Sequence, residues 1–119
     1  MGYLTIGCFA SLTGSMNYDF LLRLSKAAQR KGHRVSIWFS GNGSSSIKKG
    51  QKILKDYSHG EKHLRELISN GVEICVCESC AYARGIMKED VIEGAKWSAM
   101  HWFLSKIYEA DRVLLIGGE

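Results

Sequence analysis

The chain has 119 residues, a formal net charge of +4 and 45% hydrophobic residues, which suits one domain with its own buried core. No apolar run approaches the roughly 18 residues of a membrane span. The N-terminal MGYLTIGCFASL has neither a basic start nor a cleavage signature. We therefore expect a single domain over residues 1–119, with no membrane or export segment. The charge favours anionic small molecules or acidic partner surfaces and is too small to indicate direct nucleic-acid binding.

Four cysteines in a chain without an export signal indicate a reducing compartment, which predicts a cytoplasmic protein. In such a compartment thiols are more often chemical than structural. A CxxC pair beside alternating strands and helices is also typical of thioredoxin-like redox proteins. Proteins with the thioredoxin-like fold carry a cis-proline that faces the CxxC, whereas this chain contains no proline. Thioredoxin-like chemistry is therefore a minor alternative.

The first third of the chain predicts a strand, a helix and a second strand. Tyr3–Phe9 and Arg34–Phe39 are short, β-prone and mostly apolar. Between them a helix follows a small-residue loop, with Ser15 or Asn17 as its cap, and ends at Gly32. Its expected apolar stripe consists of Phe20, Leu21, Leu24 and Ala28.

The segment SGNGSSSIKKG over residues 40–50 is rich in glycine and serine, which offer little packing and many backbone states. We predict that it is mobile in the free protein. The lysines from Lys48 to Lys55 are expected to form a solvated segment that could meet an acidic partner or an anionic small molecule.

The rest of the chain continues the alternation of helices and strands. The predicted elements are a helix from His59 to Asn70, a strand over Val72–Cys77, a short helix over Ala81–Arg84, a helix over Lys88–Ala110 broken near Gly94, and a strand over Arg112–Ile116. Strands that are apolar on both faces indicate parallel pairing with helices on both sides. We therefore predict an α/β fold: a three-layer α/β/α sandwich around a small, mainly parallel sheet of four to five strands.

The stretch ICVCESCAYARGI carries the strongest chemical signal. Cys77 ends the third strand, at the sheet edge where parallel sheets form their binding crevices. Cys80 follows in the first helical turn, close enough in sequence to reach Cys77. Because a helix start stabilises an anion, we expect the pKa of Cys77 to be lowered. Arg84 could add positive charge or hold an anionic substrate.

Each thiol also has a plainer interpretation. Cys8 and Cys75 lie in mid-strand and are expected to fill the core. Cys77 could simply fill space at the end of its strand. Cys80 could equally be a small helix residue that packs inward. Cys75, Cys77 and Cys80 with one histidine could also bind zinc, which leaves a metal-binding or thiol-redox regulatory module as the alternative function. The histidines are scattered, and the one pair with ligand spacing, His59–His63, is more typical of a solvated helix face.

Two weaker signals lie elsewhere. The SLTGS loop after the first strand could cradle an oxyanion, but it also fits a tight turn and lacks the P-loop lysine. Trp97, Trp102 and Phe103 could stack a ring, or they could form core or an oligomer interface. The tryptophans and the apolar helix faces predict more apolar surface than one copy can hide, and hence a homo-oligomer, trimer or larger.

ICVCESCAYARGI and the terminal ADRVLLIGG together resemble the DsrE/DsrF-like sulfur-carrier family, which includes TusD-type subunits of a tRNA thiolation relay. The resemblance covers nearly the whole chain. Its most specific part is a cysteine eight residues before the glycine of an RG pair, matched here by Cys77 and Gly85. It implies an α/β/α sandwich that forms trimers or hexamers, with Cys77 as the thiol that bears sulfane sulfur and Arg84 beside its pocket.

Cys80 departs from the TusD-type pattern, where an alanine-like residue is usual, and resembles the CxxC branch of the family. The resemblance implies a sulfur carrier or sulfurtransferase that takes sulfur from a small donor (thiosulfate, tetrathionate or a persulfide) and passes it to an acceptor carrier protein. The cargo is either one sulfur atom or a thiosulfonate. In one version of that chemistry Cys80 resolves the intermediate as a disulfide, and in the other it does not. Thiolate attack requires no cofactor, so none is expected.

Overall fold

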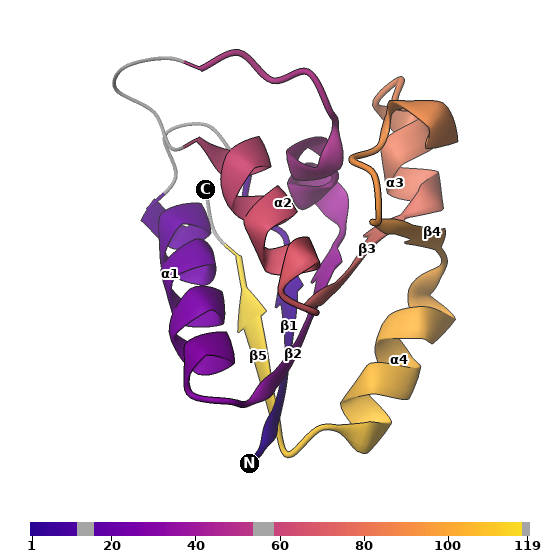
Figure 1. Cartoon of the computed structure of the whole chain (residues 1–119). Coiled ribbons are helices and arrows are strands. Elements are labelled where there is room, and N and C mark those ends of the chain that lie inside the picture. The colour runs from indigo at the N-terminus through magenta and orange to yellow at the C-terminus, as the bar shows by residue number, and fades with distance from the viewer. Residues whose placement is uncertain (12–15, 54–58, 118–119) are drawn as a thin grey trace.

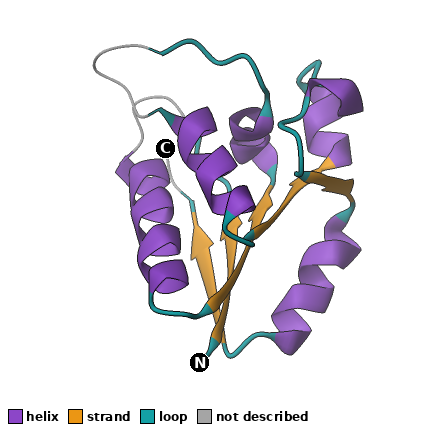
Figure 2. Ribbon diagram, in the orientation of Figure 1, coloured by secondary structure: helices purple, strands orange, loops and turns teal. Residues whose placement is uncertain are grey.

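The computed structural model describes residues 1–11, 16–53 and 59–117. Its centre is a five-stranded sheet in which every paired strand is parallel (Figures 1 and 2). The strands are β1 (Tyr3–Cys8), β2 (Arg34–Phe39), β3 (Glu73–Cys77), β4 (Lys96–Ser98) and β5 (Arg112–Ile116), in the order β4-β3-β2-β1-β5.

Helices cover both faces of this sheet. Their bounds are α1 (Met16–Arg30), the 3₁₀ helix η1 (Gly41–Ile47), α2 (Gly60–Ser69), α3 (Glu78–Ala83), the 3₁₀ helix η2 (Lys88–Asp90) and α4 (Met100–Glu109). α1 and α2 lie on one side of the sheet and α4 lies on the other (Figure 1). The predicted three-layer α/β/α sandwich is confirmed.

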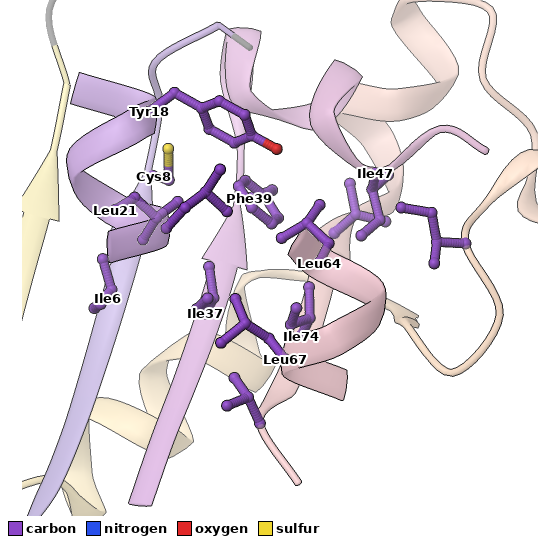
Figure 3. Packing of buried hydrophobic residues seen from close by; sticks show 14 of the residues in the cluster. Ile6, Cys8, Tyr18, Leu21, Ile37, Phe39, Ile47, Leu64, Leu67 and Ile74 are labelled. Carbon is purple, nitrogen blue, oxygen red and sulfur yellow. The ribbon is translucent and has the colours of Figure 1, made fainter. Parts of the chain in front are cut away.

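The main core lies between the sheet and the α1–α2 layer (Figure 3). Because strand side chains alternate between the two faces, every second residue of β1, β2 and β3 points into it. Its fully buried members include Ile6, Tyr18, Leu21, Ile37, Phe39, Ile47, Leu64 and Ile74. Phe20 is 52% exposed, so its predicted place in the apolar stripe of α1 is wrong; Tyr18 and Leu22 are buried instead.

The other face of the sheet packs against α4. Trp38 of β2 and Cys75 of β3 are fully buried there beneath Phe103, whose ring stacks on Trp38 with centroids 6.0 Å apart. Gly7 of β1 allows this approach, since an added Cβ would lie 2.8 Å from the Phe103 ring. α4 thereby buries the middle of this face, and the thiol of Cys75 with it.

The predicted helix over residues 88–110 is wrong in its first half. Residues 88–90 form η2, and Lys96–Ser98 form β4, which pairs in parallel with Cys75–Cys77 of β3. Gly94 permits the turn between them with a φ of +90°. The helical spacing of Trp97 and His101 is therefore coincidental, because Trp97 belongs to a sheet-edge strand.

The predicted mobility of residues 40–50 is contradicted by the packing of η1. Gly43, Ser44, Ser46 and Ile47 are buried, and Lys48 forms a β-bridge with Val91. An added Cβ on Gly43 would lie 2.4 Å from the Cys8 carbonyl oxygen. The small residues thus permit close packing of η1 against the end of β1.

Two predictions concern the region after β1. Asn17 does not cap α1, because the helix begins at Met16 and Asn17 lies inside it; its side-chain amide donates to the carbonyl of Gly117 at 2.6 Å. Ser15 and the SLTGS loop after Ser11 lie outside the described residues.

No helix within the described ranges is long and apolar enough to cross a membrane.

Candidate functional site

The Cys77–Cys80 turn lies at the carboxyl edge of the sheet, where β2 and β3 end side by side. Phe39 pairs with Val76, so the next residues of the two strands, Ser40 and Cys77, stand at the same edge. α3 begins directly after β3, with Cys77 in the capping position and Cys80 in the first turn. Both cysteines are free and partly exposed, as a reactive pair requires.

Cys80 is surrounded by groups from two other elements. The hydroxyl of Ser40, at the end of β2, lies 3.5 Å from the Cys80 Sγ. Arg84 donates from Nη1 to the carbonyl oxygen of Cys80 at 3.0 Å and from Nη2 to Asn42 Oδ1 at 3.0 Å. Asn42 belongs to η1, so a hydrogen bond from η1 helps to hold the guanidinium beside the thiol pair.

The two thiols differ in acidity. Burial raises the pKa of Cys77, and its hydrogen bond to the Cys80 sulfur raises it further, outweighing backbone N–H groups of Cys80 and Ser79 that favour its thiolate. Burial also opposes ionisation of Cys80, yet its pKa is lowered by hydrogen bonds from the Ser40 hydroxyl, the Gly41 backbone and the Cys77 thiol and by the Arg84 charge. The expectation that Cys77 has the lowered pKa is therefore wrong: Cys80 is the more acidic thiol.

The other cysteines lie in the interior. Cys8 and Cys75 are fully buried, as predicted for core residues. Burial raises the pKa of the Cys75 thiol to about 12, so it stays protonated at neutral pH. Cys75 shares a sheet face with Cys77 but lies under α4.

The described residues offer little support for a metal centre. No group of three or more His, Cys, Asp or Glu side chains within residues 1–11, 16–53 and 59–117 is arranged to hold an ion. The His59–His63 pair belongs to the start of α2, where His63 contacts the Lys26 ammonium. Burial and the Lys26 charge lower the pKa of His63, so its imidazole is neutral at pH 7.

The predicted aromatic cluster is divided between the two faces of the sheet. Trp102 and Phe103 of α4 stack on Trp38 of β2, whereas Trp97 packs against the main core on the other face. Trp97 also makes an edge-to-face contact with Tyr82 of α3, with centroids 5.8 Å apart. These rings therefore form core and support α3, and they do not form one stacking platform.

The sequence predicted both site cysteines and Arg84, but not Ser40, Gly41 or Asn42. These residues fall in the segment that composition marked as mobile. Their signal was positional: they directly follow a strand that is adjacent to β3, and parallel strands end at a common edge. These residues lie near the cysteines because β2 and β3 are adjacent in the sheet. No local sequence pattern predicts that order of strands.

Comparison with known proteins places this arrangement in a family. The DsrE/DsrF-like family model matches residues 8–115. The chain belongs to the DsrE/DsrF-like family. The family is linked in general terms to sulfur relay, and the match includes the whole cysteine turn.

Relatives are found at the level of sequence and of structure. The chain is 36% identical over 93 residues to an uncharacterized protein of Methanocaldococcus jannaschii, covering 78% of this chain and 81% of that one. A second, from Methanopyrus kandleri, is 33% identical over 93 residues, covering 78% and 76%. The fold is similar to that of the YchN protein of E. coli, with a TM-score of 0.90 at 22% identity over 98% of this chain and 100% of that one. A protein of unknown function from Methanobacterium thermoautotrophicum shares it with a TM-score of 0.76 at 14% identity, over 96% and 99%.

Proposed function

We propose that this protein is a sulfur carrier or sulfurtransferase that accepts sulfane sulfur on the Cys77–Cys80 pair as a persulfide and passes it to an acceptor protein thiol. The observation that carries the proposal is the pair of free, partly exposed thiols in mutual contact at the carboxyl edge of the sheet. Membership in a family linked to sulfur relay supports it.

The chemistry needs only the chain's own groups. A thiolate attacks the sulfane sulfur of a donor R–S–SH, the S–S bond of the donor breaks, and R–S⁻ leaves, so the sulfur now forms a persulfide on the protein. An acceptor thiolate repeats the exchange. Because the electrons balance at each step, no cofactor is required, and the protein would act in a reducing compartment such as the cytoplasm.

The donor is proposed to be small and anionic. Thiosulfate, tetrathionate and persulfides all present a sulfane sulfur, and Arg84 holds a positive charge beside the pair. Cys77, which ends β3 at the edge of the sheet, is proposed to bear the carried sulfur, and the family's spacing of a cysteine eight residues before the glycine of an RG pair supports this. The cargo is one sulfur atom with a persulfide donor, and a thiosulfonate if attack on tetrathionate releases thiosulfate.

We also propose that the working form is a homo-oligomer, trimer or larger. Large apolar side chains of α4 and β5 are exposed on one copy, namely Met100, Leu104, Tyr108, Val113 and Leu115. Burying such a surface against another copy removes it from water. Light scattering at micromolar concentration should show an assembly; a monomer there would contradict this part of the proposal.

A thiol-redox regulatory module is the second candidate, because the contact between Cys77 and Cys80 also suits a reversible disulfide. The two functions are separated by mass spectrometry. A sulfur carrier gains the mass of sulfur atoms or of a thiosulfonate that a reductant removes, whereas a redox module only loses two hydrogens.

The test exposes the purified protein separately to thiosulfate, tetrathionate and sodium tetrasulfide and measures its intact mass before and after reductant. The control is the double variant Cys77→Ser/Cys80→Ser, which keeps both interior thiols. We expect reductant-sensitive mass gain in the parent and none in the double variant. No gain in the parent with any donor, or equal gain in both proteins, would overturn the proposed function.

A further inference from the structure

We propose that Cys80, the second cysteine of the pair, makes the first attack on the sulfur donor and then hands the sulfur to Cys77. This inference rests on the proposed function and deepens it, because the family pattern marks only Cys77 as a sulfur-bearing thiol. It assigns an entry thiol and a holding thiol, and it gives Ser40 the role of a positioning residue.

The first step of the argument is the contact between Ser40 and Cys80. A thiolate can only accept hydrogen bonds, so the hydroxyl 3.5 Å from the Cys80 Sγ must donate when Cys80 is ionised. Ser40 is itself 7% exposed, and its backbone N–H donates to the Cys8 carbonyl at 3.1 Å. The donor is therefore held in place by the end of the sheet, and the Gly41 backbone supplies a second contact to the same sulfur.

The second step is the placement of positive charge. Arg84 lies one turn after Cys80 and is tied to the Cys80 carbonyl and to Asn42. A guanidinium carries five N–H donors, and these two bonds leave donors available for a donor's anionic group. An anionic donor bound there would lie beside the Cys80 sulfur.

The third step concerns the groups that face Cys80. From β3 the neighbour is Cys77, whose thiol donates to the Cys80 sulfur, and on α3 the nearby charge is Arg84. η1, which packs against α3, consists of Gly, Asn, Ser and Ile and so brings hydroxyls and amides without a formal charge. The lowered pKa of Cys80 and the raised pKa of Cys77 agree with this geometry.

The exchange between the two cysteines balances without an outside oxidant. Cys80–S⁻ attacks R–S–SH and gives Cys80–S–SH and R–S⁻. Cys77 then loses its proton to solvent, and its thiolate attacks the outer sulfur. A new S–S bond forms on Cys77, the old one breaks, and Cys80 leaves as the better-stabilised thiolate. The Ser40 hydroxyl, which can donate to the Cys80 thiolate, and the lowered pKa of Cys80 make it a suitable leaving group as well as the entry nucleophile.

The test of the positioning role is the pH dependence of alkylation. Iodoacetamide labelling of the parent, mapped by peptide mass, should modify Cys80 at lower pH than Cys77. Ser40→Ala should move the Cys80 profile to higher pH and slow its labelling at pH 7 by about tenfold for each unit of pKa. Ser25→Ala, which removes a buried serine hydroxyl from α1, is the control and should leave the profile unchanged. An unchanged profile in Ser40→Ala would overturn the positioning role.

The order of attack is tested with sodium tetrasulfide and single variants at pH 7. Cys77→Ser should still load sulfur at near the parent rate, on Cys80. Cys80→Ser should load more slowly than Cys77→Ser, because it lacks the thiol that contacts Ser40 while burial still opposes ionisation of Cys77. Loading that survives in Cys80→Ser and is lost in Cys77→Ser would overturn this inference while leaving the proposed function intact. Absence of loading in the parent would instead overturn the proposed function.

Discussion

Cys75 and Cys80 lie on either side of the end of β3, and their surroundings give them opposite chemistry. Cys75 is enclosed beneath α4, where burial raises the pKa of its thiol to about 12. Cys80 is only partly buried and contacts a hydroxyl, a backbone N–H and a second thiol, with a guanidinium nearby, and its pKa is lowered. Both are free cysteines in the same short stretch of chain.

The difference shows that the position of a thiol in the sheet, rather than the residue type, determines whether its surroundings favour the thiolate. In mid-strand the neighbours are hydrocarbon and paired backbone, which cannot stabilise a thiolate. At the carboxyl edge the strands give way to turns, whose hydroxyls and amides are available to a sulfur anion. Substitutions in the interior should therefore change stability, and those at the edge should change reactivity.

The largest expected effect is on the interior side of this comparison. Phe103→Ala removes the ring that covers Trp38 and Cys75, and it should lower the free energy of unfolding by about 3–5 kcal/mol. Urea denaturation would measure this loss, and alkylation should become faster at Cys75. His101→Ala on the same helix is the control, since that side chain is exposed and lies outside the proposed oligomer surface, so it should change stability by less than about 1 kcal/mol. Equal losses in both variants would contradict the assignment of Phe103 to the core.

The next largest effect is expected at Gly43 of η1, where one substitution should change both the stability of the interior and the reactivity of Cys80. Gly43→Ala would place a Cβ 2.4 Å from the Cys8 carbonyl oxygen, which forces η1 away from β1 and should lower stability by about 1–3 kcal/mol. Because η1 carries Asn42, alkylation of Cys80 should also slow. Gly117→Ala, where a Cβ meets nothing within 4 Å, is the control. Unchanged stability in Gly43→Ala would show that η1 is not closely packed.

Serine substitutions compare the two thiols directly. Cys75→Ser buries a hydroxyl in an apolar site and should lower stability by about 1–3 kcal/mol, while sulfur loading stays normal apart from any unfolding. Cys80→Ser should keep stability within about 0.5 kcal/mol while loading slows. Thermal melts and loading assays on both variants give the two readouts. If stability and sulfur loading fell together in both variants, the result would contradict the proposed separation of interior thiols from edge thiols.

The smallest expected effect is on the placement of Arg84. Asn42→Ala removes one of its two hydrogen-bonded partners. Such an exposed contact is worth about 1 kcal/mol or less, so Cys80 alkylation at pH 7 should slow by at most about fivefold. Arg84→Gln should have a larger effect, because it removes the charge itself; the reverse order would show that Asn42 acts on Cys80 by another route.

The sequence predicted most of the strands and the positions of the cysteines, but it did not predict the acidity of the thiols at the edge of the sheet. Four of the five strands were predicted, because each of them is a short run of mostly apolar residues with high β-propensity. β4 was missed because Trp97 and His101 share helical spacing, although Lys96–Ser98 pair with β3. The positions of Cys77 and Cys80 could be predicted from the end of an apolar run. Their acidity could not, because it depends on Ser40 and Gly41, which only the order of strands brings to the same edge.

The central claim is that the edge pair carries sulfur and the interior thiols do not. It is tested most directly by exposing the parent protein to sodium tetrasulfide, trapping persulfides by alkylation and assigning the added sulfur to single residues by fragmentation of the modified peptides. We expect the sulfur on Cys77 or Cys80, with Cys8 and Cys75 unmodified. Sulfur on Cys8 or Cys75, or on no cysteine, would contradict the account.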